Sequence, residues 1–357
     1  MHTLDNLSRL GQLDTSNMLE SIAFLPRQIE QAWSETEKLK IPANYKKINK
    51  VVINGMGGSG LGTHLIRSIY FKELKLPVGN IHSYDLPGLV DKNTLYLLSS
   101  YSGTTEEPLS TFVTAKKRGA KILGITSGGE LAALIQNGKL PGYVFSPEKY
   151  NPCGQPRIGL GFSVAGILGL LNRCGIIKTD PREITRAIQT ASSLNDTFSA
   201  RTPFAQNPAK QIAADLADKI PVVIASEFLA GNAHVLANQL NENAKTFSTY
   251  FLIPELNHHL LEGMQHPKTN KNNLHFIFLE SNLYHPRNQK RFTITKDILA
   301  QNKIKYSTLP ALGNSYLEQS FTTLLFGSYL SFYLAILNNL DPSAIPYVDY
   351  FKEKLSH

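Results

Sequence analysis

The 357-residue sequence predicts an α/β protein with two tandem domains of one type, each a mostly parallel sheet flanked by helices. Strand-like apolar runs alternate with helical patterns, which is typical of parallel sheets covered by helices on both faces. The alternation stops at a long polar helical segment, residues 178–202, and then starts again. Each series ends in a long apolar helix, at 158–174 and at 316–338. We therefore expect one domain over 1–178 and a second over 179–357.

The first series of elements follows a helical N-terminal region. Apolar residues recur at helical spacing between Asp14 and Lys40, and the pattern is interrupted near Pro26. Further along, β-branched and aromatic runs predict strands, and periodic apolar residues between them predict helices. The expected strands are 50–53, 79–84, 94–98, 121–125 and 143–145, and the expected helices are 61–70, 107–117 and 130–137.

The second series has the same alternation but lacks turns rich in Gly, Ser and Thr. Its expected helices are 208–218, 230–243 and 288–301, and its expected strands are 220–225, 246–250, 275–279 and 305–309. The two halves therefore look like one α/β unit used twice, with a richer set of ligand-binding turns in the first.

Charge and composition limit the classes of ligand and the cellular compartment that we expect. The net charge of +8 favours an anionic ligand, but Lys and Arg are scattered, which argues against nucleic-acid binding. Two distant cysteines, Cys153 and Cys174, are too few for a disulfide framework and suggest a reducing compartment. The polar N-terminus lacks a signal-peptide pattern, and no uninterrupted apolar run reaches about 18 residues. We expect a cytoplasmic protein that does not span a membrane.

Two turns of the first series carry the strongest chemical signal. VVINGMGGSGLG, residues 51–62, passes from a β-branched run into a glycine-rich turn and then a helical pattern. SSYSGTTEEP, residues 99–108, follows another strand and supplies five Ser and Thr side chains. Loops that follow parallel strands meet at the same edge of the sheet, and helix N-termini there attract anions. The sequence therefore predicts a phosphate site.

A dinucleotide is the alternative ligand of these turns. Gly55, Gly57 and Gly60 match the spacing G-x-G-x-x-G, and Asp85 follows the next strand, where a ribose-binding acid is expected. A small phosphate monoester makes better use of the second turn, because its three terminal oxygens accept hydrogen bonds from short hydroxyl side chains. An NAD(P)-binding oxidoreductase thus stays open as the alternative to a phosphosugar protein.

Five motifs resemble one known family. GMGGSG and SYSGTTEE are similar to the sugar isomerase domain, and three later motifs follow in the order found in bifunctional phosphoglucose/phosphomannose isomerases. These are PRIGLGFSVAGIL at 156–168, QLNENAK at 239–245 and PELNHH at 254–259. The resemblance covers nearly the whole chain. It implies tandem sugar isomerase domains that interconvert glucose 6-phosphate, and possibly mannose 6-phosphate, with fructose 6-phosphate through an enediol, without metal or cofactor.

The resemblance also implies four catalytic residues. Glu242 is expected to be the base that moves a proton between C1 and C2, and His258 the group that opens the sugar ring. Arg157 is expected to stabilise the charge of the enediolate. Lys352, near the C-terminus, is expected to assist ring opening, with Lys354 as the alternative.

The histidine turn departs from the family pattern. The family usually has His-Asn-Glu here, whereas this chain has His259 and Leu260 after His258, so that His259 is a rival for the ring-opening role. Together with Glu262, the two histidines are also the nearest approach to a metal-ligand cluster. A solvated turn or a helix start after Pro254 is the preferred interpretation, and we expect no metal.

Short hydroxyl side chains and glycines are expected to hold the hexose phosphate. Specificity for mannose depends in the family on a threonine near the C-terminal segment, where Ser343 is the neighbouring hydroxyl in this chain. The expected substrate-binding residues are Gly57, Gly58, Ser59, Ser100, Ser102 and Thr105.

The resemblance further implies a homodimer in which the ring-opening histidine comes from the neighbouring subunit. A sugar-phosphate-sensing regulator without catalysis is a second alternative. Such proteins usually add a DNA-binding helix-turn-helix, and neither end of this sequence is strongly basic.

Overall fold

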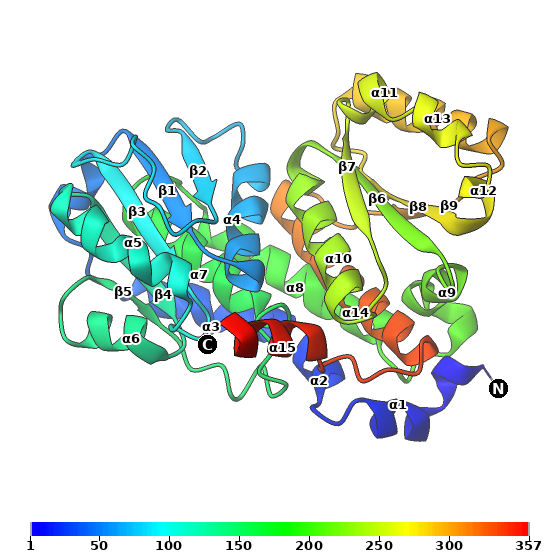
Figure 1. Ribbon diagram of the computed structural model, residues 1–357, viewed down its shortest axis with the longest axis horizontal. Helices are drawn as coiled ribbons and strands as arrows, with labels where there is room; N and C mark the ends of the chain where they lie inside the picture. The colour runs from blue at the N-terminus through cyan, green and yellow to red at the C-terminus, as the bar shows by residue number, and fades with distance from the viewer. Residues whose placement is uncertain (1, 356–357) are drawn as a thin grey trace.

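Two separate parallel sheets organise the computed structural model, which describes residues 2–355 (Figure 1). The first has the strand order β2-β1-β3-β4-β5 and the second β7-β6-β8-β9. The strands are β1 Lys50–Asn54, β2 Val78–Ile81, β3 Thr94–Ser99, β4 Lys121–Thr126, β5 Gly142–Val144, β6 Ile220–Ser226, β7 Thr249–Ile253, β8 Leu274–Glu280 and β9 Lys305–Pro310. The expected α/β class with two tandem parallel sheets is confirmed.

Both sheets share one topology. In each, the second strand pairs with one side of the first, and the third strand pairs with the other side. The connections after the first and third strands therefore leave in opposite directions, which creates a crevice at the carboxyl edge, the usual ligand position in such folds. In the first sheet this crevice lies between β1 and β3, the two strands that precede the glycine-rich and hydroxyl-rich turns.

The helices of the first half flank its sheet (Figure 1). α7 lies between this sheet and the N-terminal helix α3, and α4 lies between this sheet and the second half. They are α1 Leu7–Leu13, α2 Met18–Ala23, α3 Leu25–Glu37, α4 Gly57–Ile69, α5 Glu106–Lys117, α6 Gly129–Gln136 and α7 Leu160–Arg173. α4 begins four residues earlier than expected, because Gly57–Gly60 adopt the helical first turn instead of a separate loop.

The second half is connected through α8, which packs against both α3 and α14. Its helices are α8 Pro181–Phe198, α9 Pro208–Asp215, α10 Ala230–Glu242, α11 Leu256–His259, α12 Asn270–Asn273, α13 Pro286–Gln301, α14 Tyr316–Leu337 and α15 Pro346–Leu355. β7 starts three residues later than expected, since the chain first passes through the left-handed Lys245 (φ 51°). α11 agrees with the helix start expected as one alternative after Pro254, whereas the short helix α12 and the terminal α15 were not expected.

The N-terminal segment is tied to the second half. Asp5 forms an ion pair with the fully buried Lys210 of α9, with 2.9 Å between Oδ1 and Nζ. The same ammonium donates to the carbonyl oxygens of Ala200 and Thr202, so that its charge is satisfied without water. The division at 178/179 stays a prediction, and this contact joins its two parts.

Two apolar helices form the centre of the molecule. α7 packs between α3 and α4, and α14 packs against α8, α9 and α10. α14 is long and apolar enough to cross a membrane, yet 94% of its most apolar window is buried inside the protein. It is therefore the core helix of a globular fold.

Glycine permits the close contact between α7 and α3. A Cβ at Gly169 would lie 1.9 Å from Thr36 Oγ1, whereas a Cβ at Gly11, in the exposed α1, would meet no atom within 4 Å. We expect Gly169→Ala to lower the free energy of unfolding by about 1–3 kcal/mol through overpacking. Gly11→Ala is expected to raise it by up to about 1 kcal/mol through helix propensity.

Urea unfolding of the two variants beside the wild type measures both changes. The same substitution should change the free energy of unfolding in opposite directions in the two helices. Equal changes would contradict the described packing of α7.

Candidate active site

The two turns expected to bind phosphate lie against each other. The Oγ of Ser99, at the end of β3, donates to the carbonyl oxygen of Ser59 at 2.8 Å. The backbone N–H of Tyr101 donates to Ser59 Oγ, also at 2.8 Å. Ser59 therefore links the start of α4 to the turn after β3, and the two turns form one continuous surface at the carboxyl edge of the first sheet.

Glycines bring backbone groups close together in these turns. A Cβ at Gly58 would lie 2.8 Å from the carbonyl carbon of Pro156 and 2.9 Å from the backbone nitrogen of Arg157, so only glycine fits. Gly57 has a φ of 48° and faces open space, where a ligand can approach its backbone. The α4 N-terminus thus lies directly beside the segment that carries Arg157.

The hydroxyl groups of the second turn are held in two pairs. Ser100 Oγ is 2.7 Å from Thr105 Oγ1 and accepts the Gly103 N–H, which fixes it inside the turn. Ser102 is exposed, and its Oγ lies 3.1 Å from Thr104 Oγ1. Thr105 precedes α5 without capping it by its side chain, so the first N–H groups of α5 are available to an anion.

Arg157 is buried at the junction of the two halves, with 2% of its side chain exposed. Nε donates to Asn243 Oδ1 and Nη1 to Gln155 Oε1, each at 2.6 Å. Nη2 donates to the carbonyl oxygens of Pro342 at 3.1 Å and Ser343 at 2.9 Å. The guanidinium is therefore oriented by groups from three separate parts of the chain.

Glu242 lies next to this guanidinium, at the last residue of α10. Its Oε2 is 3.6 Å from Arg157 Nη1, and a third of the side chain, 32%, is exposed. Burial raises the pKa of Glu242 above its ordinary value, whereas the charges of Arg157, Lys352 and Lys245 oppose this effect. The result is a carboxylate that is partly desolvated, reachable from solvent and surrounded by cations.

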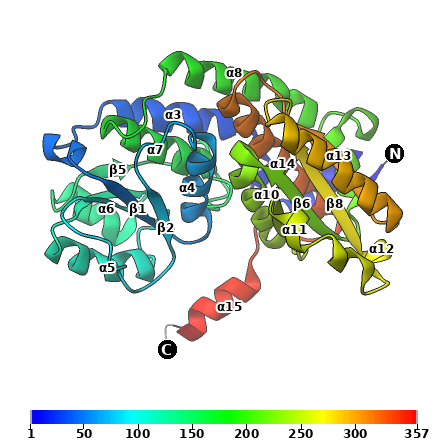
Figure 2. The same cartoon turned by 90° about the horizontal axis from the view of Figure 1, so that it is seen from above.

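Lys352 is the C-terminal lysine whose charge acts on Glu242. It lies on α15, which has no buried residue and projects from the body of the protein in Figure 2. Lys354 Nζ instead lies 5.6 Å from the ring centre of Tyr350. Of the two candidates, Lys352 is therefore the one that the electrostatics of Glu242 favour.

His258 does not meet Glu242 within one chain. α10 starts at the carboxyl edge of the second sheet and ends at Glu242, and β7 returns to the carboxyl edge before α11 begins. The 13 residues of α10 span roughly 20 Å, which separates the two side chains. His258 is exposed on α11, and the ring of its rival His259 lies 5.9 Å from that of Phe251.

Sequence reasoning missed three contacts of Arg157, namely Gln155 and the backbone carbonyls of Pro342 and Ser343. Gln155 precedes the Pro-Arg motif by one residue and carries no signal of its own. Carbonyl groups occur at every residue, so no pattern of side chains can reveal which of them accept a hydrogen bond. The neighbouring Asn243 and Lys245 belong to the QLNENAK motif, and that motif was the available signal for them.

The corresponding crevice of the second sheet is occupied by a side chain of the protein itself. Glu227 follows β6 with a φ of 45°, and its Oε1 accepts the backbone N–H of His285 and the Nδ2 of Asn288, both at 2.8 Å. These donors lie at the N-terminus of α13. A carboxylate of the protein therefore lies at the N-terminus of α13 in the second half.

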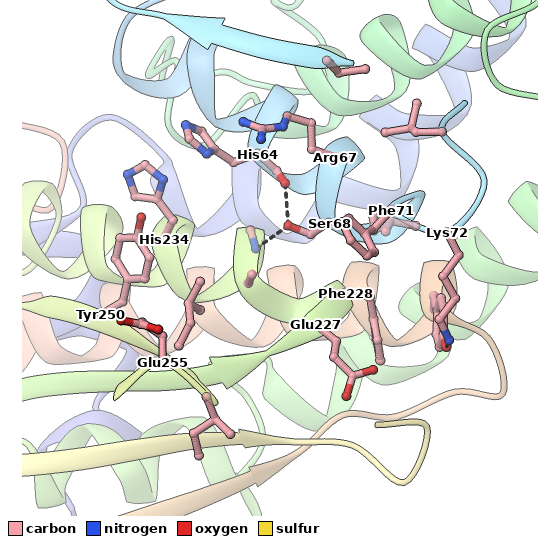
Figure 3. Close-up of a pocket in the computed structure, with 18 of the residues that line it drawn as sticks. His64, Arg67, Ser68, Phe71, Lys72, Glu227, Phe228, His234, Tyr250 and Glu255 are labelled. Carbon is pink, nitrogen blue, oxygen red and sulfur yellow. Dashed lines mark hydrogen bonds between the residues drawn. The ribbon is translucent and has the colours of Figure 1, made fainter. Parts of the chain in front are cut away.

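A hollow of about 830 Å³ lies between α4 and β2 on one side and α10 and β7 on the other. Figure 3 shows His64, His234 and Tyr250 on its wall and Ser68 bridging His64 to the backbone of Gly231. Burial and His234 lower the pKa of His64 to about 4, which leaves the imidazole neutral near pH 7. None of the residues expected to bind or convert substrate lines this hollow.

Comparisons with known proteins identify the family of the chain. Residues 205–355 match the model of the bacterial phospho-glucose isomerase C-terminal SIS domain. The chain is 33% identical to the bifunctional phosphoglucose/phosphomannose isomerase of Caldicellulosiruptor bescii over 95% of its own length and 99% of that protein. It belongs to this family. It is also 30% identical to the enzyme of the same name from Aquifex aeolicus over 92% of this chain and 97% of that one.

Solved structures show the same fold. A hypothetical protein of Thermus thermophilus superposes with a TM-score of 0.71 at 15% identity, covering 99% of this chain and 93% of the other. The family thus supports the phosphosugar interpretation of the turns over the dinucleotide alternative. In addition, β2 ends at Ile81, so that Asp85 lies four residues beyond the strand end and is exposed.

Metal ligands are not gathered anywhere among residues 2–355: no group of three or more His, Cys, Asp or Glu side chains is placed to hold an ion. His258, His259 and Glu262 accordingly form no such cluster.

The contact of Gly58 with the Arg157 segment gives a test of the phosphate surface. We expect Gly58→Ala to displace the α4 N-terminus, because its Cβ has no room against Pro156 and Arg157. The Kd for fructose 6-phosphate, measured by calorimetric titration, should rise at least about tenfold, or 1.4 kcal/mol. Gly88→Ala, at a position with open space around it, is the control and should bind as the wild type does.

Proposed function

We propose that the protein is an aldose–ketose isomerase that interconverts glucose 6-phosphate, and mannose 6-phosphate, with fructose 6-phosphate. The observation that carries the proposal is the Glu242–Arg157 pair, in which Oε2 of Glu242 lies 3.6 Å from Nη1 of Arg157. Gly58, at the α4 N-terminus, lies against the backbone of Arg157. A carboxylate, a buried cation and a phosphate-binding surface are the parts that this chemistry requires.

In this mechanism the α4 and α5 N-termini and the hydroxyls of Ser59, Ser100, Ser102 and Thr105 hold the phosphate. Glu242 removes the proton from C2 of the open-chain aldose, and negative charge develops on the substrate oxygens of the enediolate. Arg157, fixed by its hydrogen bonds before the reaction starts, stabilises that charge without having to reorient. The hydroxyl proton of O2 passes to O1, and Glu242 returns its proton to C1, which gives the ketose.

Ser343 supports tolerance of the mannose epimer. Its carbonyl oxygen binds Arg157, its side chain is 4% exposed, and its Oγ has no hydrogen-bond partner in the described part of the chain. We propose that this small hydroxyl leaves room at C2 of the sugar for both configurations.

We further propose a cytoplasmic homodimer with a shared site. His258 is exposed and remote from Glu242 of its own chain, which supports a ring-opening histidine that comes from a second copy. Lys352 then assists ring opening from the same chain as Glu242.

Replacing the base tests the reaction. Glu242→Gln keeps the shape of the side chain but removes its basicity, and we expect kcat for fructose 6-phosphate to fall by about 10²–10⁴. A coupled assay of glucose 6-phosphate formation measures it. For the wild type, kcat/KM should fall as pH drops through the raised pKa of Glu242, since the protonated carboxyl cannot act as base.

The Glu242→Gln control is its Kd for fructose 6-phosphate, which should change little because the phosphate contacts remain. A variant with wild-type turnover would exclude Glu242 as the base.

Mixing two inactive variants tests the shared site. Glu242→Gln and His258→Ala should each be inactive alone, but a mixed dimer contains one site with both residues intact. After dissociation and random reassociation of equal amounts, we expect about a quarter of wild-type activity, because half of the dimers are mixed and each has one working site. No recovery, with mixed dimers verified by mass spectrometry, would place both residues in one subunit's site.

A further inference from the structure

Lys245 lies three residues after Glu242 in an unusual backbone conformation. Its φ of 51° is in the left-handed region, which residues with a side chain rarely adopt. Such a conformation persists only where surrounding contacts hold it, and it is often found at functional sites. For Lys245, the contacts of the side chain supply that support.

The ammonium group of Lys245 joins two parts of the site. Nζ donates to the carbonyl oxygen of Asn243, in its own turn, at 3.0 Å and to that of Asp341 at 2.5 Å. Asp341 precedes Pro342 and Ser343, whose carbonyl oxygens bind Arg157. Two cations thus hold three successive carbonyl groups of the segment that leads from α14 to α15.

This segment determines where Lys352 lies. α15 has no buried residue and projects away from the body of the protein (Figure 2). The contacts at Asp341, Pro342 and Ser343 lie shortly before it in the chain, so they limit the positions that α15 can reach.

The electrostatic environment agrees with this arrangement. Arg157 before α7, Glu242 at the end of α10 and Asp341 after α14 are the charged groups that act on Lys245. Partial burial and Arg157 lower the pKa of Lys245 to about 8. The positive charge of Lys245 in turn lowers the pKa of Glu242.

We propose that Lys245 is a positioning residue for the isomerase reaction, which clamps the Asp341–Ser343 segment to the turn after Glu242 and so holds the base, Arg157 and α15 in their working arrangement. This rests on the proposed function. Lys245 touches the supporting backbone and acts through Glu242 and Lys352.

The test compares Lys245→Met with Lys245→Arg in the full-length protein. For Lys245→Met, kcat for fructose 6-phosphate should fall at least about tenfold while KM changes less than about threefold, because the phosphate contacts are untouched. The acidic limb of its kcat/KM profile should move to higher pH, since a charge that lowers the pKa of Glu242 is gone. Lys245→Arg, which keeps charge and donors, should recover most of the activity.

Lys303→Met is a matched control. Lys303 also follows a helix, α13, with a left-handed φ of 58°, but it lies outside the site. It should retain the kinetics and pH profile of the wild type. If Lys245→Met does the same, the proposal is overturned.

Amide hydrogen exchange tests the clamp without requiring activity. Peptides covering residues 341–355 should exchange at least about tenfold faster in Lys245→Met than in the wild type or Lys303→Met. Unchanged exchange would overturn the clamp even if kcat falls. A wild-type protein that binds hexose phosphate but does not isomerise it would refute the proposed function, and the exchange result would still decide the role of Lys245 in holding the segment.

Discussion

The arrangement of the site depends on the buried guanidinium of Arg157. Transferring such a charge from water into a protein costs several kcal/mol unless every donor finds a partner. Here the partners come from the nearby Gln155, from the end of α10 and from the segment after α14. The cation that faces Glu242 is therefore also one of the links between the two halves of the chain, and the halves cannot separate at this point without exposing unpaired donors and acceptors.

The candidate site combines unlike parts of the two similar halves. The first sheet contributes its carboxyl edge, where the β1 and β3 turns meet, whereas the second contributes the far end of α10. The halves approach closely at Gly231 of α10, where a Cβ would lie 2.6 Å from Leu65 Cα of α4, and at Gly58 a backbone segment ending in Arg157 occupies the space that a Cβ would need. Two halves with the same topology thus contribute different structural elements to the candidate site.

Much of the fold could be predicted from the sequence, because alternation and turn composition are local properties. The strands around Val51 and Leu97 and the apolar helix after Arg157 follow directly from periodicity. The later start of β7 could not be predicted, since it depends on the left-handed Lys245, which long-range contacts stabilise. Glu242 and Arg157 were found through motif resemblance, but their separation of 3.6 Å and the carbonyl partners of Arg157 follow only from tertiary packing.

Glu227 has a consequence for how many ligands a chain can accept. Its carboxylate takes up donors at the α13 N-terminus, the position in the second domain that corresponds to the phosphate surface of the first. A second phosphoryl group there would meet both like charge and occupied hydrogen-bond donors. In the second half, this helix end therefore has a carboxylate of the protein itself where the first half leaves its helix N-termini open, so the two halves differ in charge at corresponding positions.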